Sequence, residues 1–350
     1  MKSNLRKLVI TGGAGFIGSN FTRYFLEHNP DYEVVNLDKL TYAGNLENTR
    51  DFENHPRYRF VKGDIGDKAL VEEVLKGATA LINFAAETHV DRSLHNAEIF
   101  ITTDILGLYC LLETARKHHL EKFVQISTDE VYGDILYGYA KESDPLRPSN
   151  PYSGSKAGAD LMALAYARTY KTPLIIIRSS NNFGPFQYPE KLIPLFITNA
   201  LEGKKLPLYG DGKNVRYWLY VKDNCAAINK IFLLGKMGEI YNVGGGSEVQ
   251  NIEVAKLILA LLNKSDDLIE YVADRPGHDK RYSLDSAKVK TELNWQPQCD
   301  FKTALEETVR WYQENDGWWR SIKENQPAFG DFYRKNYDFP KSSRKTKTDD

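Results

Sequence analysis

The most constraining feature of the sequence is the eight-residue stretch TGGAGFIG, which occupies positions 11–18. It follows a short apolar run at 7–10, and it opens a segment at 16–26 whose apolar residues recur with helical spacing. This order predicts a strand, a tight glycine turn and a helix. A plain glycine-rich turn is the alternative, and it explains neither the strand before the glycines nor the helix after them.

The three spaced glycines of this stretch predict an anion site. Gly12 would permit the tight turn, Gly15 would let the backbone approach a phosphate, and Gly18 would let helix and strand pack closely. A helix that begins behind bare glycines presents free backbone N–H groups and the positive end of its dipole. We therefore expect a pyrophosphate to bind at this turn.

An acidic residue at the end of the next apolar run indicates which dinucleotide carries the bound pyrophosphate. Asp38 lies about 20 residues after Gly18, where dinucleotide-binding folds place the carboxylate that binds a ribose diol. Such a carboxylate repels a 2′-phosphate, so NAD is favoured over NADP. Lys39 follows directly, and a cation there would suit a phosphate, but NAD remains the expected cofactor.

Length, charge and cysteine usage narrow the class of protein. The 350 residues can form one large or two modest domains, and the net charge of −1, with acids and bases interspersed, argues against nucleic-acid or anionic-membrane partners. Cys110, Cys225 and Cys299 lack metal-ligand spacing and are typical of reduced thiols. The first strand leaves no room for a signal peptide, and no apolar run could span a bilayer. We expect a cytoplasmic protein without a metal site.

The first half of the sequence alternates between strand and helix patterns. Strands are expected at 7–11, 33–37, 58–62, 80–84, 122–127 and 173–178, and the helices between them include 68–76, 99–118 and 151–170. Alternation of this kind predicts an α/β fold with a doubly wound parallel sheet, the Rossmann architecture. Residues 1–178 are thus expected to form an NAD-binding domain that also carries the catalytic residues.

The pattern changes after residue 178. Gly, Pro and Asn cluster at 180–189 and 207–214, and short strands and helices are mixed beyond them. We expect 179–330 to form mainly a smaller, mixed α/β substrate-binding lobe, interleaved with late Rossmann elements such as the run at 239–243. A last helix is expected at 302–314, and the polar tail at 341–350 is expected to be disordered.

Tyr152 and Lys156 stand four residues apart within the expected helix 151–170, so their side chains share one face. An ammonium beside a phenol favours the phenolate and lowers the phenol pKa. The tyrosine could then take a proton from a hydroxyl while the carbon beneath it gives a hydride to NAD. A solvated helix face is the alternative, and the preceding dinucleotide motif favours the catalytic interpretation.

The motif STDEVYG at 127–133 begins where the fifth expected strand ends. Ligands of open parallel sheets bind at the carboxyl ends of the strands, so Thr128, Asp129 and Glu130 should face the active cleft. Two adjacent carboxyl groups cannot both ionise freely, which separates their pKa values into an acid and a base. This pair suits an elimination, in which an acid protonates a leaving hydroxyl and a base removes a carbon-bound proton. A helix cap or loop acid pair is the alternative.

Further motifs stand in an order that belongs to one family: DKLTYAGN at 38–45, FAAETHVDRS at 84–93, PYSGSKAGAD at 151–160, RSSNNFGPFQYPEKLIP at 178–194, LPLYGDGKNVR at 206–216 and DRPGHDKRY at 274–282. With TGGAGFIG and STDEVYG, they make the chain resemble the dTDP-glucose 4,6-dehydratases of the extended short-chain dehydrogenase/reductase superfamily over most of residues 8–312. The Thr-Asp-Glu trio is the most specific part, because relatives that epimerise or decarboxylate nucleotide sugars carry other residues there.

The resemblance implies a role for each matching residue. Tyr152 would deprotonate the C4 hydroxyl of the sugar, Lys156 would hold Tyr152 and the nicotinamide ribose, and Thr128 would hydrogen-bond at C4. Asp129 would be the acid at the C6 hydroxyl and Glu130 the base at C5. The NAD site would comprise Gly12, Gly15, Phe16, Ile17, Gly18, Asp38, Lys39, Asp64, Ile65, Ala85, Thr103, Ser127, Tyr152 and Lys156. The substrate would be held by Thr88, Asn182, Lys191, Pro207, Tyr209, Arg216, Asn251, Arg275 and His278, whose guanidinium groups suit a diphosphate.

The implied reaction converts a nucleoside-diphosphate glucose, with dTDP-glucose favoured, into its 4-keto-6-deoxy derivative. UDP-glucose is the alternative substrate, because a methyl contact discriminates by only about 1–3 kcal/mol. The same scaffold would also suit a nucleotide-sugar 4-epimerase or decarboxylase, or an inactive NAD-binding module, while the balanced charge argues against an RNA-binding role. The family also implies a homodimer, formed by the helices 99–118 and 151–170 of two copies as a four-helix bundle.

The sequence departs from the family pattern at two positions. Tyr217 stands where the family has an aspartate after Arg216, and we expect this position to lie near the diphosphate. Thr88 stands where serine is usual, near the sugar pocket. Neither change touches the expected catalytic trio.

Overall fold

The computed structural model describes residues 5–337, and its centre is a seven-stranded sheet. The strands are β1 Arg6–Thr11, β2 Tyr32–Asp38, β3 Tyr58–Lys62, β4 Ala80–Asn83, β5 Lys122–Thr128, β6 Leu174–Ser179 and β10 Ile240–Val243. They pair in parallel in the order β10-β6-β5-β4-β1-β2-β3. The six strands expected in the first half are confirmed, each within one residue at either end. The run at 239–243 returns to this sheet beside β6, as expected.

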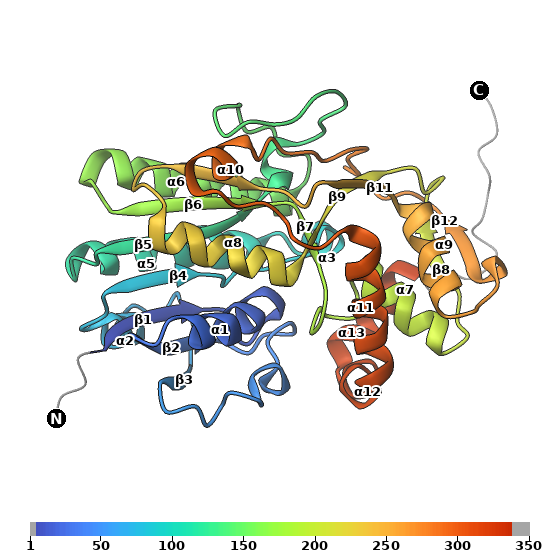
Figure 1. Cartoon of the computed structure of the whole chain (residues 1–350), viewed down its shortest axis with the longest axis horizontal. Coiled ribbons are helices and arrows are strands. Elements are labelled where there is room, and N and C mark those ends of the chain that lie inside the picture. Colours follow the sequence, from blue (N-terminus) through green and yellow to red (C-terminus); the bar gives the residue numbers. More distant parts are fainter. Residues whose placement is uncertain (1–4, 338–350) are drawn as a thin grey trace.

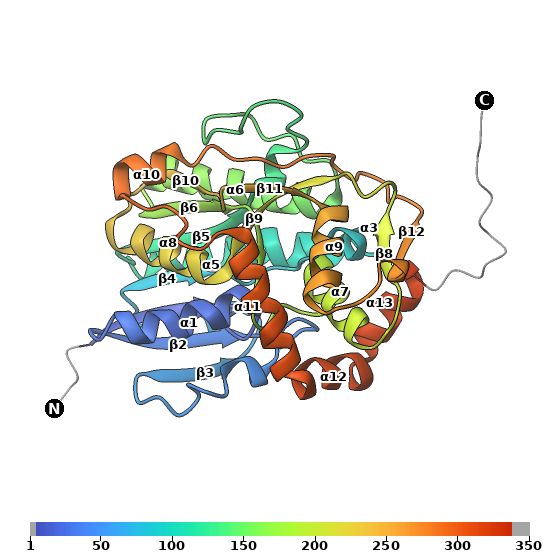
Figure 2. The same ribbon diagram turned by 45° about the vertical axis from the view of Figure 1, so that its right-hand side comes forward.

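Helices cover both faces of the sheet. The helices α1 Phe16–His28 and α8 Val221–Leu234 pack together on one face, whereas α2 Lys68–Leu75, α5 Leu108–Lys117 and α6 Pro151–Tyr170 cover the other (Figure 1 and Figure 2). Alternate residues of a strand point to opposite faces, so Leu8 of β1 joins the first core and Val9 the second. Every residue of β6 is buried, as in a strand covered on both sides. The doubly wound α/β architecture is therefore confirmed.

The expected helix at 99–118 differs from the structure in its middle. It consists of α4 Glu98–Phe100, a π-helical turn η2 at Ile101–Gly107, and then α5. A π-helical turn is rare, usually interrupts an α-helix, and is frequent at functional sites. Here the turn carries Thr103 and Asp104 towards the interior of the molecule.

The second lobe contains two small sheets and a group of helices. Its strands are β7 Asn181–Phe183, β8 Leu206–Tyr209, β9 Val215–Tyr220, β11 Ser247–Gln250 and β12 Ile269–Val272. Its larger helices are α7 Leu192–Leu201, α9 Asn251–Leu261, α11 Phe301–Glu314, α12 Asp316–Asn325 and α13 Pro327–Tyr337. The remaining elements are α3 Val90–His95, α10 Ala287–Leu293, η1 Leu46–Thr49, η3 Asp129–Tyr132 and η4 Asp266–Leu268. The boundary expected at residue 178 stays a prediction.

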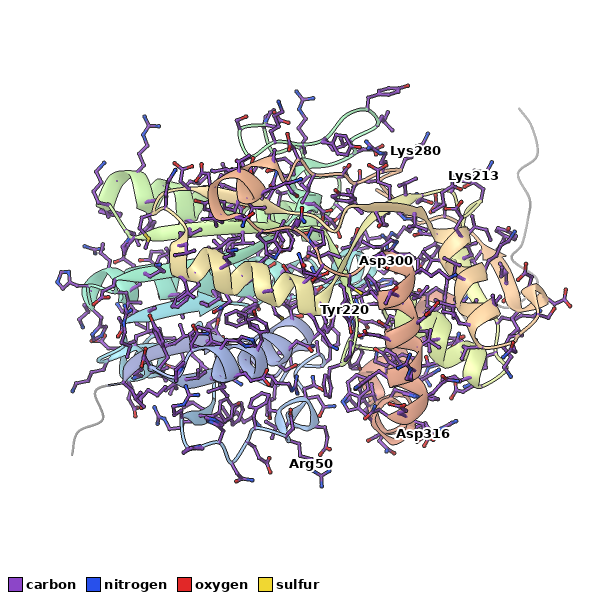
Figure 3. All side chains as sticks on the ribbon, viewed as in Figure 1. Arg50, Lys213, Tyr220, Lys280, Asp300 and Asp316 are labelled. Atoms are coloured by element: carbon purple, nitrogen blue, oxygen red, sulfur yellow. The ribbon has the colours of Figure 1, made fainter. Side chains whose placement is uncertain are left out.

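The first of the two core clusters described above extends through both lobes, and the contacts of α11 show how the lobes are joined. Asp300 caps this helix by accepting backbone N–H bonds from Lys302 and Thr303 at 3.0 and 3.1 Å. Tyr220, at the end of β9, donates a hydrogen bond to Glu307 Oε2 at 2.8 Å. Asp300 and Tyr220 are labelled in Figure 3. The large core cluster extends from β1 to Phe329 of α13, so the two lobes are packed together as one body.

Two further expectations from the sequence concern membrane-spanning helices and the C-terminal tail. None of the helices within residues 5–337 combines the length and apolar character needed to cross a membrane. The tail expected at 341–350 lies outside the described residues. The helices α12 and α13, which no expectation covered, continue the lobe beyond residue 314 as far as Tyr337.

Candidate active site

Two adjoining cavities lie at the carboxyl ends of the central strands, the position expected for ligands of such sheets. The first, called the cofactor cavity, is lined by every residue expected at the NAD site: Gly12, Gly15, Phe16, Ile17, Gly18, Asp38, Lys39, Asp64, Ile65, Ala85, Thr103, Ser127, Tyr152 and Lys156. The second, called the substrate cavity, is lined by every residue expected to hold substrate: Thr88, Asn182, Lys191, Pro207, Tyr209, Arg216, Asn251, Arg275 and His278. Tyr152 lines both cavities. The roles of these residues stay predictions.

The turn between β1 and α1 admits only glycine at two positions. Gly12 has a φ of +71°, and a Cβ there would lie 2.6 Å from Ala85 N. A Cβ on Gly18 would lie 2.2 Å from Gly12 O. The bare backbone therefore forms a cradle at the N-terminus of α1, which suits the pyrophosphate of a dinucleotide.

The side chains around the ribose position favour NAD. Asp38 is buried at the end of β2, where its carboxylate accepts N–H bonds from Ala14 at 2.9 Å and Leu40 at 2.8 Å. Lys39 Nζ lies 2.6 Å from Asp64 Oδ2. Burial alone would raise the pKa of Asp64, but the Lys39 ammonium holds it below its usual value. Lys39 is thus paired with Asp64, which weakens the case for a 2′-phosphate.

The substrate cavity brings two guanidinium groups together. Arg275 Nη1 donates to Asp91 Oδ1 at 2.9 Å, while its buried Nε has no hydrogen-bond partner among the described residues. Arg216 lies over the ring of Tyr282, 4.4 Å from the ring centre, and its Nη2 donates to Asp279 O at 3.1 Å. Guanidinium groups held in this way suit phosphate oxygens.

His278 completes this end of the cavity as a neutral group. Its Nδ1 lies 2.6 Å from Asp274 Oδ1. Burial, followed by the charges of Arg275 and Arg216, lowers the pKa of His278 to about 4. The imidazole is therefore a hydrogen-bonding group at neutral pH and adds no positive charge to the two arginines.

Tyr152 and Lys156 are positioned by the first turns of α6. A capping box, in which Asn150 Oδ1 accepts from Ser153 N at 2.9 Å, fixes the start of the helix. Lys156 Nζ donates to Ile126 O at 2.9 Å, so the lysine is held against the end of β5. Tyr152 thus lies where the two cavities adjoin, and Lys156 lines the cofactor cavity.

The direction expected for the pKa of Tyr152 differs from the one that its surroundings favour. Burial, followed by the charges of Glu130 and Asp104, raises the pKa of Tyr152 well above its usual value, although a hydrogen bond with Thr128 opposes this. Lys156 is not among the main causes of the shift. Burial and carboxylates from η2 and η3 decide its direction, and these non-local effects could not be read from the four-residue spacing.

The two adjacent acids occupy different environments. Asp129 is 2% exposed, and burial, followed by the charge of Glu130, raises its pKa well above the usual value. Glu130 lines the substrate cavity; burial raises its pKa too, while Arg275 and Arg216 oppose the shift. Asp129 does not itself line the substrate cavity, but it accepts a hydrogen bond at 3.2 Å from Thr128 Oγ1, and Thr128 does line it. The acid and base roles expected for the pair stay predictions.

Several residues at the site were missed by the sequence reasoning. Glu190 is 1% exposed, lines both cavities and accepts from Arg92 Nη2 at 2.6 Å. Tyr282 OH lies 3.3 Å from Glu130 Oε2, and Tyr337 of α13 also lines the substrate cavity. Glu190 and Tyr282 lie within motifs quoted above, so the resemblance to the family could have identified them as site residues. Tyr337 lies in none of these motifs, and nothing in the sequence pattern indicated that it lines the cavity.

The expected placement of Tyr217 near the diphosphate was wrong. Arg216 and Trp218 line the substrate cavity, whereas Tyr217 lines a separate shallow cleft with Trp295. Successive residues of a strand point to opposite faces, and all three belong to β9. Gly244 makes room for the ring, since a Cβ there would lie 2.2 Å from Tyr217 Cε1.

Comparison with known proteins agrees with this geometry. The model of the GDP-mannose 4,6 dehydratase family matches residues 9–308. A dTDP-glucose 4,6-dehydratase of Streptomyces niveus is 48% identical over 328 residues, which cover 93% of this chain and 98% of that protein. The chain belongs to the dTDP-glucose 4,6-dehydratase family.

Solved structures separate this family from others that share its fold. DesIV, a dTDP-glucose 4,6-dehydratase of Streptomyces venezuelae solved with NAD and dTDP, superposes with a TM-score of 0.89 and 50% identity, covering 91% of this chain and 100% of that one. A UDP-glucuronic acid 4-epimerase of Bacillus cereus reaches a TM-score of 0.84 with only 26% identity, covering 88% and 99%. The fold is thus shared by both activities, while the sequence is much closer to the dehydratase.

Proposed function

We propose that this chain removes water from dTDP-glucose and forms the 4-keto-6-deoxy sugar nucleotide, with NAD as a cofactor that is regenerated in each cycle. Family membership supports the reaction. The observation that carries it is the pair of acids after β5: burial and then the charge of Glu130 raise the pKa of Asp129, and Glu130 lines the substrate cavity together with Tyr152. An epimerase or decarboxylase has no use for an acid at C6.

The reaction begins at C4 of the sugar. When bound, NAD supplies the hydride acceptor for C4, the hydride donor for C6 and, in its oxidised form, a positive charge that favours the Tyr152 phenolate. Tyr152 takes the proton of the C4 hydroxyl, Thr128 hydrogen-bonds at the same oxygen, and Lys156 holds the phenol in place. The resulting C4 ketone acidifies the proton on C5.

The elimination then uses the two acids. Glu130 takes the C5 proton, and the electrons of that C–H bond form the C5–C6 double bond. The C6–O bond breaks as Asp129 gives its proton to the departing hydroxyl, so one water leaves. A hydride added at C6 and a proton returned to C5 by Glu130 complete the 4-keto-6-deoxy sugar. Arg216 and Arg275 hold the diphosphate throughout.

Incubation of the purified protein with dTDP-glucose, and separately with UDP-glucose, tests this function. Mass spectrometry should detect a product that has lost one water, formed faster from dTDP-glucose. Faster dehydration of UDP-glucose would reassign the nucleotide. An isomer of unchanged mass from both substrates would replace the dehydratase with an epimerase, and no conversion at all would leave an NAD-binding module.

We further propose a homodimer in the cytoplasm. Exposed apolar side chains gather on η2, α5 and α6, among them Leu106 at 56%, Tyr109 at 49% and Leu161 at 58% exposure. Apolar groups gathered in this way suit an interface, here a four-helix bundle made of α5 and α6 from two copies. The three cysteines are free thiols, which suits a reducing compartment.

A further inference from the structure

The last described helix, α13, forms part of the wall of the substrate cavity. Its final residue, Tyr337, lines that cavity, whereas the match to the family model ends at residue 308. The reaction proposed above gives this helix no part. A side chain that lines a substrate cavity without a role in the chemistry is a candidate for substrate binding.

Aromatic and backbone contacts hold the helix on the cavity wall. The Phe332 ring is 4% exposed, and its centre lies 4.8 Å from the ring centre of His89, which lines the substrate cavity. The Arg92 guanidinium lies 5.0 Å from the centre of the Phe332 ring, and its Nη2 donates a hydrogen bond to Ala328 O at 3.1 Å. Because α13 is packed against the segment that carries His89 and Arg92, Tyr337 is held at the cavity.

The neighbours of Tyr337 belong to the group of residues expected to hold the nucleotide. Its ring centre lies 6.0 Å from that of Tyr209, and the two ring planes are tilted by 37°. Tyr209 donates a hydrogen bond to Asp91 Oδ2 at 3.0 Å, and Asp91 Oδ1 accepts from Arg275 Nη1 at 2.9 Å. Tyr209 therefore stands between Tyr337 and the ion pair that orients Arg275.

The order of the groups in a sugar nucleotide indicates which part of it reaches Tyr337. Hydride transfer requires the sugar to lie at Tyr152, where the two cavities adjoin. The diphosphate comes next along the substrate, at Arg216 and Arg275, and the nucleoside follows it. Tyr209 and Tyr337 line the substrate cavity and not the cofactor cavity. Since Tyr209 separates Tyr337 from Arg275, the nucleoside is the part within reach of the Tyr337 ring.

We propose that Tyr337 is a substrate-binding residue whose ring contacts the nucleoside of the sugar nucleotide, so that α13 belongs to the active site. Aromatic side chains stack on nucleobases, and the neighbouring Tyr209 ring adds a second aromatic surface. Tyr337 contributes to binding and takes no part in the chemical steps. This inference rests on the proposed function, since that function supplies a nucleoside-diphosphate sugar as the substrate.

The substitution Tyr337→Ala removes the ring and tests the contact. The KM for dTDP-glucose and the Kd of dTDP should both rise by roughly tenfold, the scale of one base–aromatic contact. The kcat at saturating substrate should stay within about twofold of wild type, because the lost contact is the same in ground state and transition state. The matched control is Tyr271→Ala, which removes a 57% exposed ring from β12 that lines neither cavity. It should leave KM, Kd and kcat unchanged.

Two inhibitors distinguish a nucleoside contact from an effect on Arg275. With dTDP-glucose as the substrate, the inhibition constant of dTDP should rise in Tyr337→Ala, whereas that of inorganic pyrophosphate should not change. Pyrophosphate carries the diphosphate without the nucleoside, so it reports on the arginines alone. An equal loss of affinity for both inhibitors would mean that Tyr337 acts through Tyr209 and Asp91, and it would overturn the proposal. An unchanged inhibition constant for dTDP would overturn it as well.

A second variant guards against loosening of α13. The ring centre of Tyr337 lies 6.0 Å from that of Phe332, and Tyr337→Leu keeps apolar bulk beside it while removing the aromatic face. Calorimetry should still find weaker dTDP binding by Tyr337→Leu, and a Kd equal to that of wild type would contradict the ring contact. Calorimetry with dTDP does not depend on turnover. A wild-type protein that binds dTDP without dehydrating dTDP-glucose would therefore overturn the proposed reaction, while the Kd values of the variants would still decide the role of Tyr337.

Discussion

At the scale of single residues, the proposed chemistry depends on how burial distributes protons among neighbouring acids. Burial and then the charge of Glu130 raise the pKa of Asp129, whereas the nearby arginines oppose the rise that burial causes in the pKa of Glu130. Burial and then the charges of Glu130 and Asp104 raise the pKa of Tyr152. These directions suit the proposed roles of Asp129 as the acid at C6 and Glu130 as the base at C5.

The substitution Tyr152→Phe tests the base at C4. Turnover of dTDP-glucose should fall by about 10²–10⁴-fold, the usual contribution of general-base catalysis, while calorimetry should find dTDP affinity unchanged. Tyr170→Phe, at the exposed end of the same helix, is the matched control and should retain activity. If Tyr152→Phe turns over within a few-fold of wild type, another group is the base.

At the scale of elements, sequence patterns predicted those features that depend on local order. The glycine turn before α1 and the Tyr152–Lys156 face of α6 follow from spacing alone, and both lie where expected. The π-helical turn η2 has no residue signature, so it could not be predicted. The pairing of Lys39 with Asp64 joins the ends of neighbouring strands, and the contact of Tyr337 with the cavity depends on how α13 packs. Such non-local contacts exist only in the folded chain.

The alternation along β9 gives a prediction at this scale, with neighbouring residues as test and control. Arg216→Lys should raise the KM for dTDP-glucose by roughly tenfold, because a lysine cannot reproduce the guanidinium geometry. Tyr217→Phe, one residue further on and facing the separate cleft, should leave KM unchanged. Steady-state kinetics at one pH suffices. A rise in KM for Tyr217→Phe equal to that for Arg216→Lys would contradict the assignment of the two faces.

At the scale of the whole molecule, a shared core holds the two lobes so that the cavities meet at Tyr152. In the proposed reaction, the Rossmann lobe supplies the catalytic side chains, and the second lobe supplies Arg216, Asn251 and Arg275 for the nucleotide end. The exposed apolar faces of η2, α5 and α6 lie on the side of the sheet opposite α8. A second copy could therefore cover them without touching the helices α1 and α8.

The proposed dimer is tested by charges placed on this face. Leu161→Glu combined with Leu106→Glu should convert the dimer into a monomer, because each substitution would bury an unpaired carboxylate in the interface. Leu234→Glu, equally exposed but on α8, should remain dimeric. Sedimentation velocity distinguishes the two states. A monomeric wild type, or a dimer that survives the double substitution, would contradict the proposed interface.

Oxidation, water loss and reduction are proposed to occur within one active site, and the fate of the C4 hydrogen decides whether they do. dTDP-glucose that carries deuterium at C4 should give a 4-keto-6-deoxy product with that deuterium at C6, as read by NMR. The hydride leaves C4 and returns at C6 without exchange with water, whereas the C5 proton passes through Glu130. Deuterium found again at C4 in a product that has lost no water would contradict this reaction sequence.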